Sequence, residues 1–177
     1  MMKALLVIDI QNDYFPGGRY PLWNADAVLA NIVRAIKAAK AKAVPVILVQ
    51  HVADPGLGIA PFFNAGTEGA ELHPRVLEAA AGAPVVVKSF ADAFHKTSLE
   101  QVLAGLGVTD ILVCGMMTQN CVTHTAISKT AEKYRVSILH DCCTTVDAMI
   151  HNIALNAVST RVPLVMAGEA LQVRPRR

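Results

Sequence analysis

Short apolar runs alternate with amphipathic segments along most of the chain. The apolar runs are rich in β-branched residues, as in buried strands, and the segments between them space apolar residues three and four positions apart, as in helices. Strands are predicted at residues 4–10, 45–51, 84–88, 110–114, 136–140 and 163–166. Helices are predicted at residues 26–43, 75–81, 98–106, 120–134 and 147–159.

Strands that alternate with helices predict an α/β fold. We expect a single Rossmann-like domain over residues 1–177, with three α/β/α layers, a six-stranded, mainly parallel sheet and a basic tail at 173–177. The pattern does not give the strand order. Residues 52–74 are rich in Gly and Pro, which predicts a binding or lid loop. Thr97 and Glu100 have capping-box spacing and are expected to open the helix at 98–106.

Composition excludes two classes of protein. Hydrophobic residues make up 53% of the chain and charged residues 17%, which excludes intrinsic disorder. Asp9 interrupts the best apolar run, which is far shorter than the roughly 18 residues of a membrane-spanning helix. No signal-peptide pattern is found, so we expect a cytoplasmic protein with no membrane partner.

The small positive charge comes from the end of the chain. Lys and Arg number 16 against 14 Asp and Glu, and Arg174, Arg176 and Arg177 lie among the last four residues. The rest of the chain is nearly neutral, and its one lysine cluster, within residues 37–42, is typical of a solvated helix face. We therefore expect no nucleic-acid partner.

The four cysteines have neither zinc-site nor disulfide spacing. Cys114 lies in a predicted strand and Cys142 and Cys143 follow one, so packing explains them; a redox role for the adjacent pair is a weaker alternative. Cys121 instead begins a predicted helix, where free N–H groups and the helix dipole stabilise a thiolate. Cys121 is therefore the candidate reactive thiol.

Three reactive side chains lie at predicted strand ends, where parallel sheets bind ligands. Asp9 falls inside an apolar strand and needs a partner, because burying an unpaired carboxylate costs several kcal/mol. Lys88 closes the third predicted strand and is an available cation, and Cys121 follows the fourth. His124, one helical turn after Cys121, is a weaker candidate base.

Several motifs occur together in order. They are DIQNDYF at 9–15 with Gly17-Gly18, then Lys88, then GMMTQNCVTHTA at 115–126 and DCCTT at 141–145. In these motifs the sequence resembles the isochorismatase-like cysteine hydrolase superfamily, which includes nicotinamidases, N-carbamoylsarcosine amidohydrolase and isochorismatases. The match covers most of the chain.

The resemblance implies a catalytic triad of Asp9, Lys88 and Cys121. It also implies a cis peptide between Met116 and Met117, which would turn the Met117 N–H toward the Cys121 N–H to form an oxyanion hole. Gln11 and Asn12 would support Asp9. In the implied mechanism Lys88 and the helix terminus lower the pKa of Cys121, Asp9 takes the thiol proton, and a thioester forms.

Departures from the family narrow the expected chemistry. Nicotinamidases carry a metal site built on Asp-x-His, and here Val49 precedes His51 by two positions. A site of His51 with Asp54 and His73 is a weaker alternative, so we expect no catalytic metal and no cofactor. Because isochorismatases proper do not need a cysteine nucleophile, Cys121 favours hydrolysis of a C–N bond in a small-molecule amide.

Aromatic residues are expected to line the pocket. Tyr14 matches an aromatic pocket position of the family, and the other candidates rest on proximity in the predicted fold: Phe15, Trp23, Phe62, Phe94, Met117 and Gln119. The family also suggests a homo-oligomer, a dimer or larger. Isochorismatase-type and nicotinamidase-type hydrolases remain as alternatives. A non-catalytic binding domain is opposed by the lack of a G-x-G-x-x-G motif after the first strand.

Overall fold

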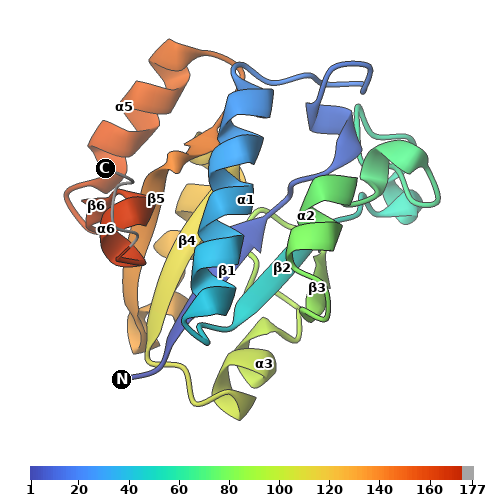
Figure 1. The fold of residues 1–177 in the computed structure, drawn as a ribbon. Helices are drawn as coiled ribbons and strands as arrows, with labels where there is room; N and C mark the ends of the chain where they lie inside the picture. The colour runs from blue at the N-terminus through green and yellow to red at the C-terminus, as the bar shows by residue number, and fades with distance from the viewer. Residues whose placement is uncertain (173–177) are drawn as a thin grey trace.

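A computed structural model of the chain describes residues 1–172 and shows one six-stranded sheet between helices (Figure 1). The strand order is β3-β2-β1-β4-β5-β6, and every neighbouring pair is parallel. The strands span Lys3–Ile8 (β1), Val46–His51 (β2), Val85–Lys88 (β3), Asp110–Met116 (β4), Arg135–Thr144 (β5) and Leu164–Val165 (β6). The predicted α/β class and strand set are confirmed, and the predicted tail at 173–177 lies outside the described residues.

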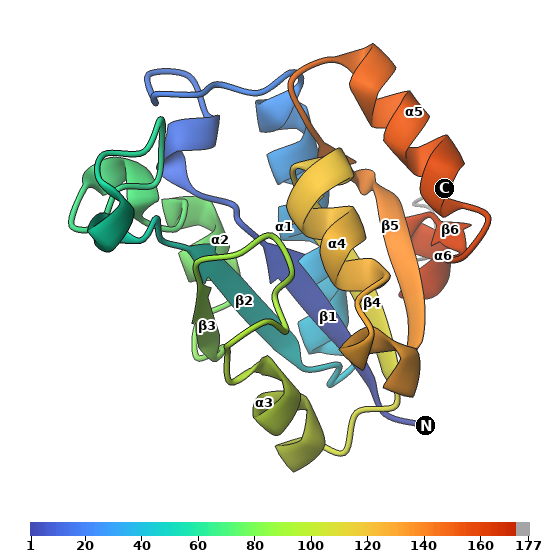
Figure 2. The same cartoon turned by 180° about the vertical axis from the view of Figure 1, so that it is seen from behind.

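Helices cover both faces of the sheet, which gives the three layers. In Figure 1 helices α1 and α2 lie in front of the sheet, and the opposite view in Figure 2 shows α3 and α4 over the other face. Helices α5 and α6 lie beside β5. The helices span Ala25–Ala41 (α1), Pro74–Ala79 (α2), Leu99–Gly105 (α3), Thr123–Ala126 (α4), Ala148–Val158 (α5) and Ala167–Ala170 (α6).

The predicted helix at 120–134 is wrong, because the structure has separate short helical segments there and no continuous helix. A π-helical turn at Thr118–Val122 leads into the four-residue α4, and a 3-10 turn follows at Thr130–Lys133. The side chains of this segment form tertiary hydrogen bonds: Thr125 Oγ1 accepts from the Ala93 N–H at 2.9 Å, and Ser128 Oγ donates to Asp92 Oδ2 at 2.7 Å. Local periodicity carries no information about those distant partners.

The predicted capping box is also wrong. Ser98 occupies the N-cap of α3 with no side-chain capping bond. The Thr97 hydroxyl accepts from the Leu99 N–H at 3.2 Å and donates to the Ala93 carbonyl, while Glu100 forms an ion pair with Lys133. Competing partners on neighbouring elements therefore replace the reciprocal bonds of the box.

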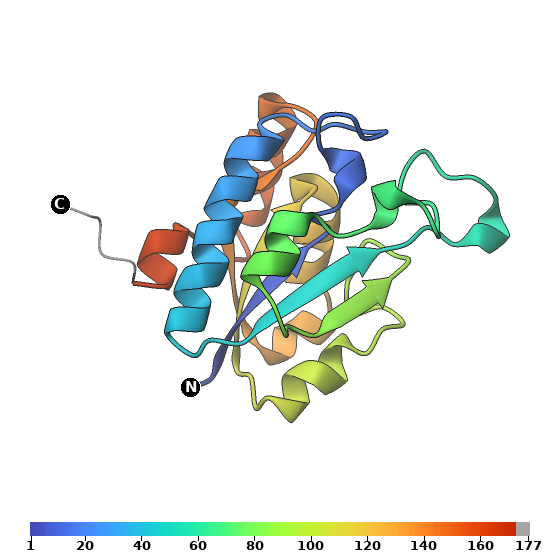
Figure 3. The same ribbon diagram turned by 45° about the vertical axis from the view of Figure 1, so that its right-hand side comes forward.

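The predicted loop at 52–74 is built around two 3-10 turns, Pro55–Leu57 and Glu68–Ala70. It extends from the body in Figure 3 and returns to it at Phe63, whose N–H donates to the buried carboxylate of Asp13 at 2.7 Å. Phe62 and Phe63 pack against Tyr14, with ring centroids 5.3 and 4.5 Å away. The base of the loop therefore forms part of the carboxyl-end edge of the sheet.

The switch in strand order lies between β1 and β4. The chain builds outward from β1 through β2 to β3 on one side and from β4 through β5 to β6 on the other. In open parallel sheets of this kind, ligands bind outside the carboxyl ends of the strands at such a switch point. Asp9 follows β1 there, and the segment that carries Cys121 follows β4.

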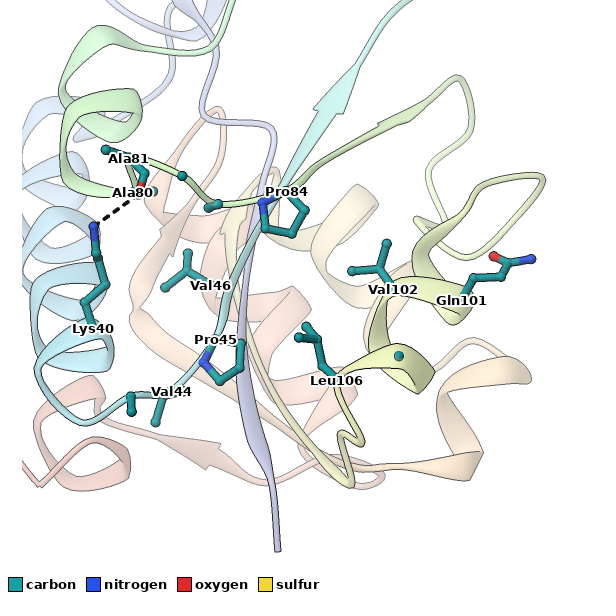
Figure 4. A pocket seen from close by; sticks show the side chains of 14 residues that line it. Lys40, Val44, Pro45, Val46, Ala80, Ala81, Pro84, Gln101, Val102 and Leu106 are labelled. Atoms are coloured by element: carbon teal, nitrogen blue, oxygen red, sulfur yellow. Dashed lines mark hydrogen bonds between the residues drawn. The ribbon is translucent and has the colours of Figure 1, made fainter.

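An apolar cavity of about 610 Å³ lies at the opposite, amino-end edge (Figure 4). Lys40 is its one charged lining residue among the described part of the chain, and the Lys40 ammonium donates to the Ala81 carbonyl at 3.3 Å. It contains none of the predicted site residues.

Among the helices within residues 1–172, none combines the length and apolar character that a membrane span requires.

Candidate active site

Asp9 is the first residue after β1 and has left-handed backbone geometry, with φ of 56°. Such a conformation costs a non-glycine residue about 1–3 kcal/mol and is typical of functional positions. Its N–H donates to the Val49 carbonyl at 3.0 Å, which fixes the turn, and the residue is completely buried. The carboxylate therefore lies buried at the carboxyl end of β1, near the centre of the sheet.

Gly115 allows β4 to run beside this turn. It pairs in register with Ile8 and has φ of +129°. A Cβ atom at Gly115 would lie 2.1 Å from the Ile8 carbonyl oxygen, closer than any side chain tolerates. Only glycine fits here, immediately before the Met116–Met117 peptide, which is cis in this structure.

Lys88 is the last residue of β3, and its ammonium nitrogen lies among four acceptors. Hydrogen bonds run from Nζ to His51 Nδ1 at 2.8 Å, to the Phe90 carbonyl at 3.0 Å and to Cys121 Sγ at 3.2 Å. Asp9 Oδ2 lies 2.9 Å from Nζ as a charge contact, and neither carboxylate oxygen of Asp9 accepts a hydrogen bond of good geometry from the described residues.

Cys121 lies in the π-helical turn after β4 and is 2% exposed. Its sulfur, an Asp9 carboxylate oxygen and a ring nitrogen of His51 all lie within 4.8 Å of one another. The structure thus brings together the three residues predicted to be catalytic, from three different strand ends. The other thiols, Cys114, Cys142 and Cys143, are free and buried in the core.

The pKa of the Cys121 thiol is raised in this structure, so the expectation that it is lowered is wrong. Burial raises the pKa of Cys121, and the Asp9 carboxylate raises it further, while Lys88 acts in the opposite direction. Removal of the sulfur from water therefore outweighs the stabilising effect of the Lys88 ammonium on the thiolate. Burial alone would lower the pKa of Lys88, but the charges of Asp9 and Cys121 raise it, so the ammonium stays protonated.

Tyr14 is the predicted pocket residue with the clearest link to the site. Burial raises the pKa of its phenol, and the charges of Asp9 and Cys121 add to that rise, which places the ring in their field. Phe62 and Phe63 pack on its ring, and Phe63 also lies 5.9 Å from the His51 ring. These aromatic rings form an apolar wall beside the polar cluster.

The remaining pocket candidates have varied surroundings. Phe15 packs on His73, Phe94 stacks on Tyr134, and the half-exposed Trp23 lies 6.0 Å from the His151 ring. Gln119 lies two residues before Cys121 and has a buried side-chain oxygen with no partner among residues 1–172. The buried Met117 contacts the Gln119 amide through its sulfur at 4.0 Å.

Gln11 and Asn12 are predicted to support Asp9, and the structure gives them other partners. The Gln11 amide donates to the His51 carbonyl at 2.7 Å and accepts from the His51 N–H at 2.8 Å. Asn12 donates to the Glu68 carbonyl at 2.9 Å and braces the long loop. Both side chains follow the turn at Asp9 and point toward β2 and the loop, where backbone groups need partners.

Sequence reasoning missed the role of His51 in the cluster. His51 pairs in register with Lys88 at the adjoining strand ends of β2 and β3, and strand order was needed to see this. It also missed a contact between the Thr118 hydroxyl and His151 Nδ1 at 2.8 Å, which ties α5 to the segment before Cys121.

Asp9, His51 and Cys121 offer atoms of the types that bind metals. The ammonium of Lys88 lies within 3.2 Å of an atom of each of them. A buried cation thus already occupies the point where these atoms converge, and it would repel a second one. The donor set as folded does not fit a metal ion.

Comparisons with known proteins give the family. A family model described as the isochorismatase domain matches residues 3–170. The isochorismatase family protein YddQ of Bacillus subtilis (strain 168) is 37% identical over 154 residues, which cover 86% of this chain and 83% of that protein. A streptothricin hydrolase of Streptomyces noursei is 33% identical over 97% of this chain and 64% of its own length.

The fold has close counterparts among solved structures. An isochorismatase family protein from Desulfovibrio vulgaris superposes with a TM-score of 0.86 at 28% identity, covering 99% of both chains. The two proteins therefore share the same parallel sheet and the same covering helices.

Proposed function

The chain belongs to the isochorismatase family of hydrolases, and within that family we propose that it is a cysteine hydrolase that cleaves an amide-type C–N bond of a small molecule. The convergence of Asp9, Lys88 and Cys121 in one buried cluster carries this proposal. A base and a thiol that share one cation between them are parts that nucleophilic acyl transfer can use.

In the first step, Asp9 takes the proton of the Cys121 thiol. Asp9 suits this role because one of its oxygens lies within 4.8 Å of Cys121 Sγ, and neither oxygen accepts a hydrogen bond of good geometry within the described chain. The sulfur then attacks the amide carbonyl carbon, a C–S bond forms, and the carbonyl electron pair moves to oxygen. Lys88, hydrogen-bonded to the sulfur at 3.2 Å, stabilises the thiolate while it forms.

In the second step, the tetrahedral intermediate collapses. We assign its oxyanion to the backbone N–H groups of Met117 and Cys121, since Met117 caps the π-helical turn that contains Cys121. The C–N bond breaks, the protonated Asp9 gives its proton to the leaving nitrogen, and a thioester remains on Cys121.

Water completes the cycle. Asp9, again a carboxylate, takes a proton from water as the oxygen attacks the thioester carbonyl. The C–S bond breaks, the proton returns to the sulfur, and a carboxylic acid leaves. The overall reaction is amide plus water to acid plus ammonia or amine.

The surroundings favour a small, uncharged substrate. The aromatic wall of Tyr14, Phe62 and Phe63 supplies apolar contact, and Asp9 balances the charge of Lys88. The side chains of Asp9 and Lys88 are fully buried, so a charged substrate would lose its hydration with no free counter-charge to replace it.

The test is ammonia or amine release from a panel of small uncharged amides, with mass spectrometry of the intact protein to trap an acyl adduct. Wild type should release the amine and gain the acyl mass on Cys121. Cys121→Ala should lose both, and Cys142→Ala, which removes another buried thiol, should keep both. Full turnover in Cys121→Ala would overturn the thioester mechanism.

A further inference from the structure

The ammonium group of Lys88 has three N–H bonds but four neighbours that attract them. Three of these neighbours accept hydrogen bonds of good geometry: His51 Nδ1, the Phe90 carbonyl and Cys121 Sγ. Asp9 Oδ2 is the fourth, at 2.9 Å, and it attracts the ammonium by charge in poorer hydrogen-bond geometry than the other three. A carboxylate is the strongest acceptor of the four, so something must direct the N–H bonds elsewhere.

We propose that His51 is a positioning residue that, as a neutral acceptor, turns Lys88 so that one N–H meets Cys121 and Asp9 stays free to take the thiol proton. The proposal rests on the proposed function in one respect, namely that Asp9 acts as the base. With His51 and the Phe90 carbonyl each accepting one N–H, the third is left for the sulfur, 3.2 Å away.

The contact fixes the tautomer of His51. An ammonium can only donate, so His51 Nδ1 must present its lone pair, and the ring proton must lie on Nε2. Burial lowers the pKa of His51, and the charge of Lys88 lowers it further, against an opposing effect of Asp9. The ring is therefore neutral at physiological pH.

Hydrogen bonds to the backbone of His51 and the register of its strand fix its position beside Lys88. The Gln11 side chain bonds both the N–H and the carbonyl of His51, and it also donates to the Ala70 carbonyl at 2.7 Å. The register of β2 and β3 sets His51 beside Lys88. Gln11 thus acts on the cluster through His51, and these hydrogen bonds compensate the complete burial of its amide.

Replacing His51 by a residue that accepts no hydrogen bond should make proton removal from Cys121 harder. In His51→Leu, the freed N–H of Lys88 can turn to Asp9 Oδ2, which is 2.9 Å away. A hydrogen bond to the ionised carboxylate makes Asp9 a weaker base, so proton removal from Cys121 becomes harder. In His51→Asn, the amide oxygen can take the place of Nδ1 and restore the acceptor.

The test is the rate of Cys121 alkylation by iodoacetamide as a function of pH, followed on the Cys121 peptide by mass spectrometry. His51→Leu should react about tenfold more slowly near neutral pH, with its profile moved about one unit higher, as expected for one charge-assisted hydrogen bond. His51→Asn should recover most of the rate. His140→Asn, a change at a half-buried histidine of β5, should match wild type.

A second measurement needs no variant. Nitrogen-15 NMR of the histidine rings of wild type should show His51 neutral, with its proton on Nε2, at neutral pH. A proton on Nδ1, a His51→Leu rate equal to wild type, or a His51→Asn rate no better than that of His51→Leu would each overturn the proposal. Because alkylation needs no substrate, lack of amide turnover with this pattern intact would count against the proposed function alone.

Discussion

Lys88 and Asp9 form a completely buried ion pair, with 2.9 Å between Nζ and Oδ2. They come from the ends of β3 and β1, which β2 separates in the sheet, so the lysine side chain reaches across a strand to meet the carboxylate. Each charge is tolerated in the interior because the other is present. This mutual dependence links stability to the proposed chemistry.

Breaking the pair should therefore destabilise the fold. Lys88→Met leaves the Asp9 carboxylate buried without its counter-ion, and we expect the free energy of unfolding to fall by about 3–5 kcal/mol. The double variant Asp9→Asn/Lys88→Met should recover most of this loss and still be inactive. Urea unfolding of the variants, together with the amide assay, measures both effects.

The matched control is the exposed pair of Lys133 and Glu100. Lys133→Met should leave the free energy of unfolding close to that of wild type, since solvent screens this pair. A double variant as unstable as Lys88→Met would show that the loss comes from packing rather than from the unpaired charge.

Gly115→Ala should be among the most destabilising single changes in the chain. The new Cβ would lie 2.1 Å from the Ile8 carbonyl oxygen at a backbone φ of +129°, so β4 would have to move away from β1. We expect a loss of about 3–5 kcal/mol, measured by urea unfolding.

Gly105→Ala provides the comparison within the same chain. Gly105 ends α3, has open space where a Cβ atom would lie and has no positive φ. This substitution should be neutral or stabilise by up to about 1 kcal/mol, because alanine favours helix. Equal losses in the two variants would contradict the steric explanation for Gly115.

Metal removal should not reduce activity. The Lys88 ammonium occupies the point where Asp9, His51 and Cys121 converge, so no reaction step as proposed involves a metal ion. Dialysis against a strong chelator, with metal content measured by plasma mass spectrometry, should leave the amidase rate unchanged. A loss of rate that added zinc or iron restores would refute this expectation.

Stability should decline as the pH falls below about 6.5, the ordinary pKa of histidine. Burial lowers the pKa values of His51, His73 and His151, so the folded state resists protonation at these rings while the unfolded state accepts it. Their contribution is fully present above about pH 6.5 and is lost progressively below it.

Urea unfolding at about pH 7.5 and pH 5.0 measures how the free energy of unfolding changes with pH. In His151→Gln the difference between the two pH values should shrink, since one of the three rings no longer titrates. An unchanged difference would mean that His151 protonates equally in the folded and unfolded states. Carboxylates add to acid denaturation in both proteins, so the comparison isolates the histidine.

Some of the fold could be predicted from local sequence and some could not. The runs of β-branched residues predicted all six strands, because a strand buried on both faces must be apolar along its length. The helix at 120–134 and the capping box at Thr97 failed, because Ala93, Asp92 and Lys133 compete for the same groups from other elements. Such partners are invisible to local periodicity.

The sequence by itself determined which reactive residues end strands or follow them: Asp9, Lys88 and Cys121. Parallel strands point the same way, so their ends share one edge of the sheet. Only the tertiary structure decided which ends touch, that Gln11 holds His51 rather than Asp9, and that His51 meets Lys88. The physical reason is that strand order and side-chain direction arise from packing between distant segments, whereas periodicity records only whether each segment is buried.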